Sequence, residues 1–173
     1  IGVGSVRAGN VIGGGDWALD RIIPDCIRSI RADKPILIRN PHATRPWQHV
    51  LEPLSGYLLL AMRLYEEPDK FSGAWNFGPN VKSIKTVKEL SEKVISVFGK
   101  GKLKLGFDKN ANHEASILHL NCDKSNTHLS WYPTWGFDET IERTINWYIG
   151  QLKGDDPKSL TMKDINEFIK LKK

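Results

Sequence analysis

Two polar segments of the chain combine residue types that suit the binding of a phosphate-bearing small ligand. The first, Arg7–Asp25, sets Asn10 among closely spaced glycines, and the second, Arg45–Val50, opens with an arginine. Glycine lets the backbone approach a ligand closely, and an asparagine amide donates hydrogen bonds. A guanidinium can form two charge-assisted bonds to a diphosphate. Together the segments predict a ligand site built from backbone, amide and positive charge.

Other site chemistries have less support in the sequence. The five histidines include no pair at i,i+4 spacing and stand apart from the two cysteines, so no metal site is predicted. Cys26 and Cys122 are far apart and lack metal spacing, which favours buried thiols of a cytosolic protein. His49 could titrate near neutral pH, but a lone histidine without a catalytic partner is more often a packing residue.

Charge and hydropathy limit the class of partner. The chain has 173 residues, a formal net charge of +5 and a pI near 9.2, which raises the question of nucleic-acid binding. The positive charge is spread and concentrates at 153–173, and aromatics do not alternate with lysines as base stacking requires. The longest apolar stretch, near Tyr57–Met62, is too short to span a membrane. Without a secretory leader pattern, we expect a cytoplasmic protein that binds neither nucleic acid nor membrane.

Periodicity predicts an α/β protein. Apolar residues recur at helical spacing in several segments, and Thr86 with Glu89 forms a capping-box pattern. We expect strands at 3–7, 36–39, 75–77, 103–107 and 117–120, an extended segment at 45–50, a glycine-rich loop at 10–18, and helices at 21–32, 53–65, 86–98, 122–129, 137–152 and 160–171. Helices that alternate with short strands are typical of this fold class.

The strand pattern also predicts an incomplete sheet. Only Val3–Arg7 has the composition of a central buried parallel strand, and such a strand needs neighbours. We therefore expect the chain to be part of a larger domain or to need a partner that completes its sheet. Residues 1–150 are expected to form one ligand-binding portion, and residues 151–173 a basic C-terminal helix or tail.

Residues 1–150 resemble the nucleotide-sugar 4,6-dehydratases of the extended short-chain dehydrogenase/reductase family. The resemblance is carried by Arg7–Trp17, Asp20–Asp25 and Arg45–Pro53, with further support from Asn76–Pro79, His113–Ala115 and the 131–148 tail. Within the family, Pro46–His49 favours the members that act on CDP-glucose over those that act on dTDP-glucose or GDP-mannose. The resemblance implies the C-terminal part of a Rossmann-type fold with a small mixed α/β substrate-binding domain, and the absence of an N-terminal cofactor half.

The resemblance also implies a reaction and a cofactor. Family members bind NAD in an N-terminal Rossmann half, oxidise C4 of the hexose, remove water across C5 and C6 and return the hydride to C6, and they use a Tyr-x-x-x-Lys pair. No tyrosine of this chain has lysine four positions on, and Gly2-x-Gly4 is too small a fragment of a dinucleotide motif. We therefore expect no catalytic residue in this chain, NAD bound mainly by a missing half, and no dehydration by the chain alone.

The resemblance assigns substrate contacts, and the residues leave alternatives open. Asn10 could instead cap a turn, Arg45 could form a surface ion pair, and Ile22 and Ile23 could be core residues. The segment at 113–116 lacks the arginine that relatives often have nearby. The predicted substrate-binding residues are Asn10, Arg21, Ile22, Ile23, Arg45, Gln48, Asn76 and His113.

Three functions remain open at this point. The chain could supply the substrate site of a dehydratase for CDP-glucose, which would serve deoxysugar supply for cell-surface polysaccharide. It could be a nucleotide-sugar binding or interaction module without catalysis. It could also belong to another extended enzyme of the same scaffold, such as a 4-epimerase or a reductase, because fold does not fix chemistry. A homo-oligomer is possible in each case.

Overall fold

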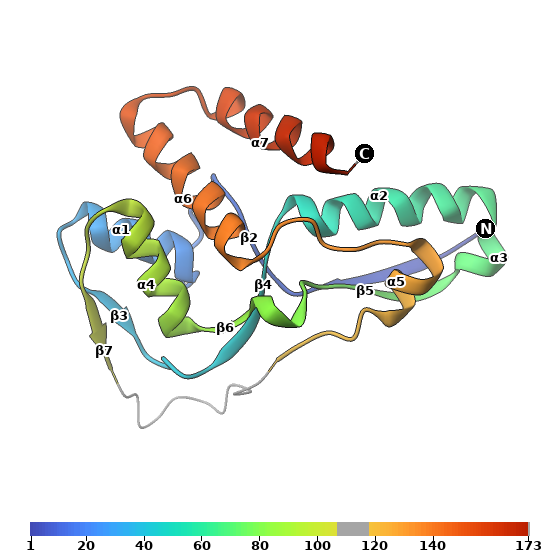
Figure 1. Ribbon diagram of the computed structural model, residues 1–173, viewed down its shortest axis with the longest axis horizontal. Helices are drawn as coiled ribbons and strands as arrows, with labels where there is room; N and C mark the ends of the chain where they lie inside the picture. The colour runs from blue at the N-terminus through green and yellow to red at the C-terminus, as the bar shows by residue number, and fades with distance from the viewer. Residues whose placement is uncertain (107–117, 173) are drawn as a thin grey trace.

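The computed structural model of the chain (Figure 1) describes residues 1–106 and 118–172 and has the predicted α/β character. Its helices are α1 (Ile22–Arg31), α2 (Leu51–Glu66), α3 (Pro68–Phe71), α4 (Val87–Phe98), α5 (Asp123–Leu129), α6 (Phe137–Lys153) and α7 (Pro157–Leu171), with a 3-10 turn η1 (Val81–Ser83). Its strands are β1 (Gly4–Ala8), β2 (Asn10–Ile12), β3 (Ile36–Ile38), β4 (Thr44–His49), β5 (Gly73–Phe77), β6 (Ile84–Thr86) and β7 (Leu103–Leu105). Within these ranges, no helix combines the length and apolar character that a bilayer span requires.

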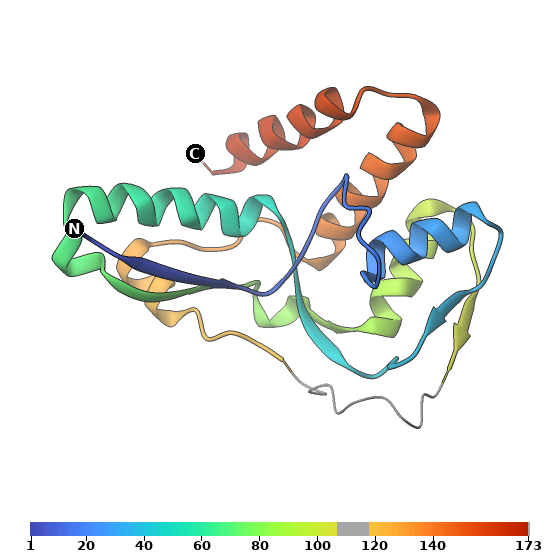
Figure 2. The ribbon, with the colours of Figure 1, turned by 180° about the vertical axis from the view of Figure 1, so that it is seen from behind.

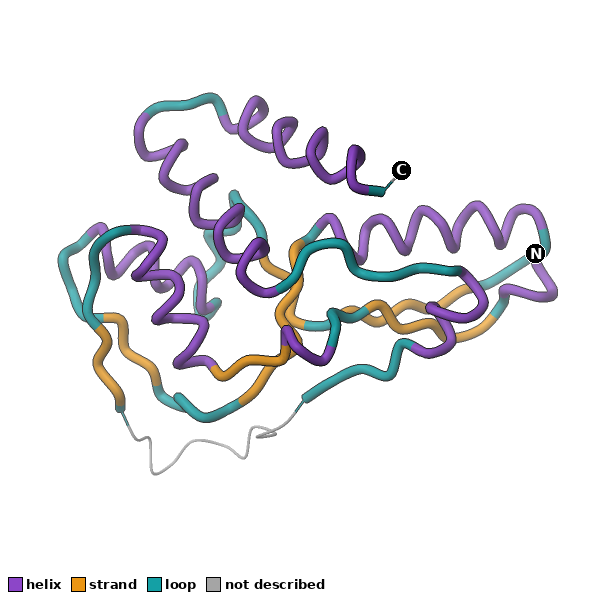
Figure 3. Tube along the Cα trace, viewed as in Figure 1, coloured by secondary structure: helices purple, strands orange, loops and turns teal. Residues whose placement is uncertain are grey.

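The strands form short sheets that the helices flank (Figure 3). β1 pairs in parallel with β5, and β3 pairs in parallel with β7. β2 pairs in parallel with β4, which in turn pairs antiparallel with β6. The first segment of the chain runs along β5 and then continues beside β4, as Figure 2 shows from behind. The step from β1 to β2 therefore links two sheets.

Three local predictions are wrong. Residues 10–12 form β2 rather than part of a loop, because their backbone pairs with β4. β1 is not a buried strand: Val6 is 39% exposed, since β5 is its one strand partner in the described part of the chain. Residues 118–120 have no regular structure, and the rest of that expected strand, with His113, lies outside the described residues.

Gly4 on β1 and Gly2 just before it let α2 pack closely against this segment. A Cβ on Gly4 would lie 2.8 Å from Leu64 Cδ1 and 3.2 Å from Leu60 Cδ2, and one on Gly2 would lie 3.0 Å from Leu64. These glycines therefore serve contact between a strand and a helix.

Two apolar clusters make up the core. The larger one joins α1, α4 and α6 with β3 and includes Ile27, Leu90 and Ile141, each fully buried. The smaller one joins α2, β5 and α5 around Trp75 and Phe77. Trp131, Trp135 and Trp147 are all buried. The predicted capping box of α4 is present, and Gly99 ends that helix in a left-handed conformation.

A buried polar junction connects the end of β4 with the segment before α6. The fully buried Glu52 accepts hydrogen bonds from Thr134 N at 3.0 Å and Trp135 N at 2.6 Å. His49 lies with its ring centroid 4.8 Å from that of Trp135, and its Nδ1 accepts from Leu51 N at 3.3 Å. His49 is thus a packing residue, and the junction fixes β4 relative to α6.

The C-terminal helix α7 packs on α6. Arg143 pairs with Asp164 at 3.1 Å, Trp147 Nε1 donates to Thr161 Oγ1 at 3.0 Å, and the buried Phe168 packs edge-on against Trp135. α6 itself continues to Lys153. The division of the chain at residue 150 stays a prediction.

Burial of His49 predicts a loss of stability in mild acid. Desolvation, with a smaller effect from Arg143, lowers the pKa of His49 from 6.5 to about 4. The unfolded chain takes up this proton below about pH 6.5, whereas the folded chain does not, so the free energy of unfolding should fall by on the order of 3 kcal/mol between pH 6.5 and 4. Urea unfolding at several pH values measures this loss.

His49→Phe is the matched variant, because it keeps a ring against Trp135 and removes the proton site. Its stability should vary less with pH across the same window. Parallel curves for the two proteins would show that His49 does not cause the acid sensitivity.

Candidate functional site

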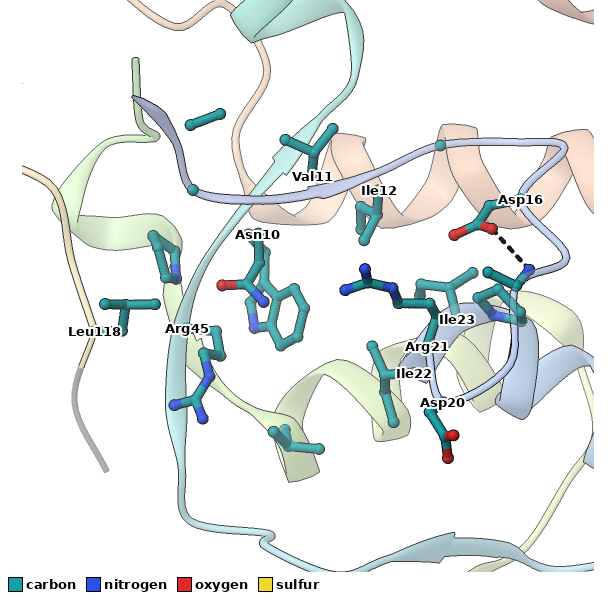
Figure 4. Close-up of a pocket in the computed structure, with 18 of the residues that line it drawn as sticks. Asn10, Val11, Ile12, Asp16, Asp20, Arg21, Ile22, Ile23, Arg45 and Leu118 are labelled. Atoms are coloured by element: carbon teal, nitrogen blue, oxygen red, sulfur yellow. Dashed lines mark hydrogen bonds between the residues drawn. The ribbon is translucent and has the colours of Figure 1, made fainter. Parts of the chain in front are cut away.

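A cleft of about 950 Å³ opens beside β2 and β4 (Figure 4). Asn10 projects into it from β2, Arg45 from β4, and Arg21 and Ile22 from the start of α1. The volume is within the range of small-molecule sites, roughly 300–1,000 Å³. The described lining comprises Arg7, Ala8, Gly9, Asn10, Val11, Ile12, Gly13, Asp16, Ala18, Asp20, Arg21, Ile22, Ile23, Pro24, Arg45, Pro46, Trp47, Val87, Leu118 and Leu120.

Strand register places Asn10 and Arg45 on one side of the sheet. Asn10 lies opposite Trp47 in the parallel β2–β4 pair, and Arg45 comes two residues before Trp47. Side chains two apart on a strand share a face, so all three project the same way. Asn10 lies in a strand and not in a turn, so it is not the turn-capping residue that the sequence left possible. An amide and a guanidinium therefore face one cleft from neighbouring strands.

Trp47 forms an apolar wall of the cleft. It is 3% exposed, and its Nε1 donates to Lys85 O at 3.0 Å on β6. Arg45 Nη1 donates to Thr44 O at 2.9 Å. With its indole anchored in this way, Trp47 gives the cleft a fixed surface next to Asn10 and Arg45.

The loop between β2 and α1 is held by both neighbouring helices. Arg28 of α1 donates to Trp17 O at 3.0 Å and to Ala18 O at 2.9 Å. The buried Tyr148 of α6 donates its hydroxyl to Asp16 O, and burial raises the pKa of that hydroxyl to about 12. The loop that forms one rim of the cleft is therefore fixed by the protein without a ligand.

Packing against the protein accounts for the loop glycines. A Cβ on Gly14 would lie 2.1 Å from Trp147 Cγ, and one on Gly9 would lie 2.6 Å from Pro46 O. The sequence suggested that glycine serves the approach of a ligand. In the structure these two positions serve the approach of α6 and of β4.

The predicted site residues divide into two groups. Ile22 is half-buried and lines the cleft, while Ile23 is 2% exposed and belongs both to the cleft wall and to the core. Gln48 and Asn76 do not line the cleft. Gln48 is fully buried and donates to Phe77 O at 2.9 Å, and Asn76 donates to Asn121 O at 2.9 Å. Side chains alternate between the two faces of β4, so Gln48 points to the opposite face from Trp47 and away from the cleft.

Sequence reasoning missed part of the lining. Asp20 and Val87 border the cleft, as do Leu118 and Leu120 from a segment far along the chain. Asp20 could have been found from the sequence, because it directly precedes Arg21, a predicted substrate-binding residue. Leu118 and Leu120 had none, since only the fold brings them to the cleft. Among residues 1–106 and 118–172, no group of three or more His, Cys, Asp or Glu is arranged to hold a metal ion.

Comparison with known proteins places this geometry in context. CDP-glucose 4,6-dehydratase of Salmonella typhimurium is 47% identical over 169 residues, which is 98% of this chain and 47% of that protein. The chain is a sequence relative of CDP-glucose 4,6-dehydratase. It spans about half the length of this relative. No protein-family model matches the chain.

Solved structures share the fold at lower sequence identity. dTDP-glucose 4,6-dehydratase from Bacillus anthracis, solved with NAD, has a TM-score of 0.70 and 22% identity, and the match covers 91% of this chain and 47% of that one. UDP-glucuronic acid 4-epimerase from Bacillus cereus, solved with NAD and a fluorinated UDP-sugar, has a TM-score of 0.72 and 19% identity, with 88% and 46% covered. These matches confirm the predicted α/β fold class, and each covers somewhat less than half of the solved chain.

Gly14→Ala should destabilise the protein and disturb the rim of the cleft. The added methyl group meets the buried ring of Trp147, and overpacking of this kind costs roughly 1–3 kcal/mol. Urea unfolding of both proteins gives the difference in free energy.

Gly136→Ala is the control, because a Cβ there has no neighbour within 4 Å and the backbone φ is −77°. It should change stability far less than Gly14→Ala. Equal stability of Gly14→Ala and the original chain would mean that the loop does not pack on Trp147 as described.

Proposed function

We propose that the protein to which this chain belongs is a nucleotide-sugar 4,6-dehydratase that acts on CDP-glucose, and that this chain supplies the substrate cleft. The sequence identity to CDP-glucose 4,6-dehydratase supports the class of enzyme. The observation that carries the proposal is the common cleft of Asn10 and Arg45. These groups offer hydrogen bonds and positive charge to a diphosphate.

Each part of the substrate has suitable neighbours in the cleft. The diphosphate accepts hydrogen bonds from the Asn10 amide and the Arg45 guanidinium, which are the residue types that bind such oxygens well. The base lies toward Arg21, Ile22 and Ile23, where the first turn of α1 offers unpaired N–H groups beside apolar side chains. The buried Trp47 closes the wall between these regions.

Three other predicted contacts keep a less direct part in the proposal. Gln48 acts from behind the cleft, by fixing β4 to the backbone of β5 through Phe77 O. Asn76 acts in a similar way, by tying β5 to Asn121. His113 lies outside the described residues and stays a prediction.

The proposed reaction converts CDP-glucose to CDP-4-keto-6-deoxyglucose, with NAD accepting hydride from C4 and returning it to C6. In the described part of the chain, Gly2 and Gly4 pack against α2, and the sequence has no Tyr-x-x-x-Lys pair. We therefore assign no proton or hydride step to this chain. The proposed setting is deoxysugar synthesis in the cytoplasm.

A second candidate is nucleotide-sugar binding without catalysis. The groups assigned above, Asn10 and Arg45, provide for binding and for no proton or hydride step. The two candidates differ in activity of the protein with NAD and CDP-glucose: a dehydratase forms the 4-keto product, and a binding module does not. A 4-epimerase on the same scaffold would instead form a product that keeps its C6 hydroxyl.

Arg45→Ala should weaken CDP-glucose binding by roughly 1.5–3 kcal/mol, the scale of a charged hydrogen-bonded contact. Asn10→Ala should weaken it by about 1 kcal/mol, because the amide contributes a neutral donor. Isothermal titration of the full-length protein with CDP-glucose measures both effects.

Arg63→Ala is the control, because Arg63 is exposed on α2 and pairs with Glu66 at 2.9 Å, outside the cleft lining. It should leave the affinity unchanged. If Arg45→Ala binds CDP-glucose as tightly as Arg63→Ala, the assignment of Arg45 to the diphosphate fails.

A further inference from the structure

The cleft contains a carboxylate that a diphosphate does not explain. Asp20 lines the cleft, and its side chain is 85% exposed. Asp16, the other carboxylate of the lining, accepts a hydrogen bond from Ala18 N at 2.9 Å and so stabilises its own loop. Asp20 has no such local role among the described contacts. A negative charge repels phosphate, so its place in this cleft calls for a ligand group that donates hydrogen bonds.

Among the described residues, Asp20 meets the guanidinium of Arg39, which follows β3 and lies outside the cleft lining. The closest distance, from Arg39 Nη2 to Asp20 Oδ1, is 3.4 Å, and the Arg39 side chain is 67% exposed. Exposed ion pairs of this kind contribute little to stability. Both groups can therefore exchange part of this contact for bonds to a ligand at little cost.

The backbone holds Asp20 at the start of α1. Its φ of +58° is in the left-handed region, which few residues other than glycine adopt. Arg21 and Ile22, the next residues, also line the cleft. Asp20 and Arg39 thus present an acceptor and a donor side by side, next to the place where the proposed function puts the base.

Among the pyrimidine bases, only cytosine has hydrogen-bonding groups that match the carboxylate and guanidinium of this pair. Cytosine shows an amine donor, N4, beside an acceptor, N3, and a carboxylate is a suitable partner for that amine. Uracil and thymine show the reverse pattern, an O4 acceptor beside an N3–H donor. A carboxylate next to O4 would leave two acceptors facing each other, and such unpaired polar groups give strong discrimination.

We propose that Asp20 and Arg39 recognise the cytosine base of the substrate. Asp20 accepts a hydrogen bond from the N4 amine, and Arg39 donates to N3. This inference rests on the proposed function, because it needs the base to lie beside Ile22 and Ile23. It adds the residues that select a cytidine nucleotide over a uridine or thymidine nucleotide.

The test compares the binding of CDP and UDP to the full-length protein by isothermal titration. Asp20→Asn should lower the preference for CDP over UDP by roughly 5- to 150-fold, which corresponds to the about 1–3 kcal/mol of discrimination that a correct base contact provides. Arg39→Gln should lower the preference as well, and it tests the pair through its other member. Arg45→Ala should weaken CDP and UDP by the same factor, because a diphosphate contact carries no information about the base.

Asp33→Asn is the matched control. Asp33 is also an exposed aspartate with positive φ, +51°, and it follows the other end of α1, away from the cleft lining. It should leave the CDP-to-UDP ratio unchanged. An unchanged ratio in both Asp20→Asn and Arg39→Gln would overturn this inference while leaving the proposed function intact. If the original protein binds neither CDP nor CDP-glucose, the proposed function itself fails, and this inference fails with it.

Discussion

The parallel pairing of β2 with β4 is the constraint on which the cleft depends. It brings Asn10, from near the start of the chain, beside Arg45 and Trp47. The pairing needs a close approach at Gly9, where any Cβ would collide with Pro46 O. It also marks the point at which the chain leaves the β1–β5 sheet and enters the sheet of β2, β4 and β6. The cleft is thus formed where the chain passes from one sheet to another.

The rest of the structure keeps β4 in place. β4 leads directly into α2, and the buried Glu52 at the start of that helix binds the backbone before α6. His49 packs on Trp135 at the same junction. From the other side, Trp147 and Tyr148 of α6 hold the loop after β2. The α6 region therefore contacts the ends of both β2 and β4. The positions of the binding groups on these strands follow from the packing of the core.

Helices were well predicted because their signal is local and periodic. The apolar positions of α1, α4 and α6 repeat every three or four residues, and the Thr86–Glu89 capping box forms as expected. Strand positions were harder. β2 is three residues long and gains its stability from β4, so composition alone suggested a loop. β1 looked buried from its apolar residues, but burial depends on what covers a strand.

The lining of the cleft was predicted in part, and the differences have physical reasons. Asn10, Arg21, Ile22, Ile23 and Arg45 all line the cleft. The resemblance assigned Gln48 to the substrate, yet strand alternation turns it to the opposite face from Trp47. The roles of Gly9 and Gly14 depend on contacts with Pro46 and Trp147, which no local pattern reveals. The meeting of Asp20 with Arg39 likewise needs the three-dimensional arrangement of α1 and β3.

In the proposed function, one chemical group, the diphosphate of CDP-glucose, lies between residues from two strands. A crystal structure of the full-length protein with CDP-glucose tests this most directly. We predict diphosphate oxygens within hydrogen-bonding distance, about 2.7–3.2 Å, of both the Asn10 amide and the Arg45 guanidinium. A substrate whose diphosphate lies outside this cleft, in contact with neither residue, would contradict it.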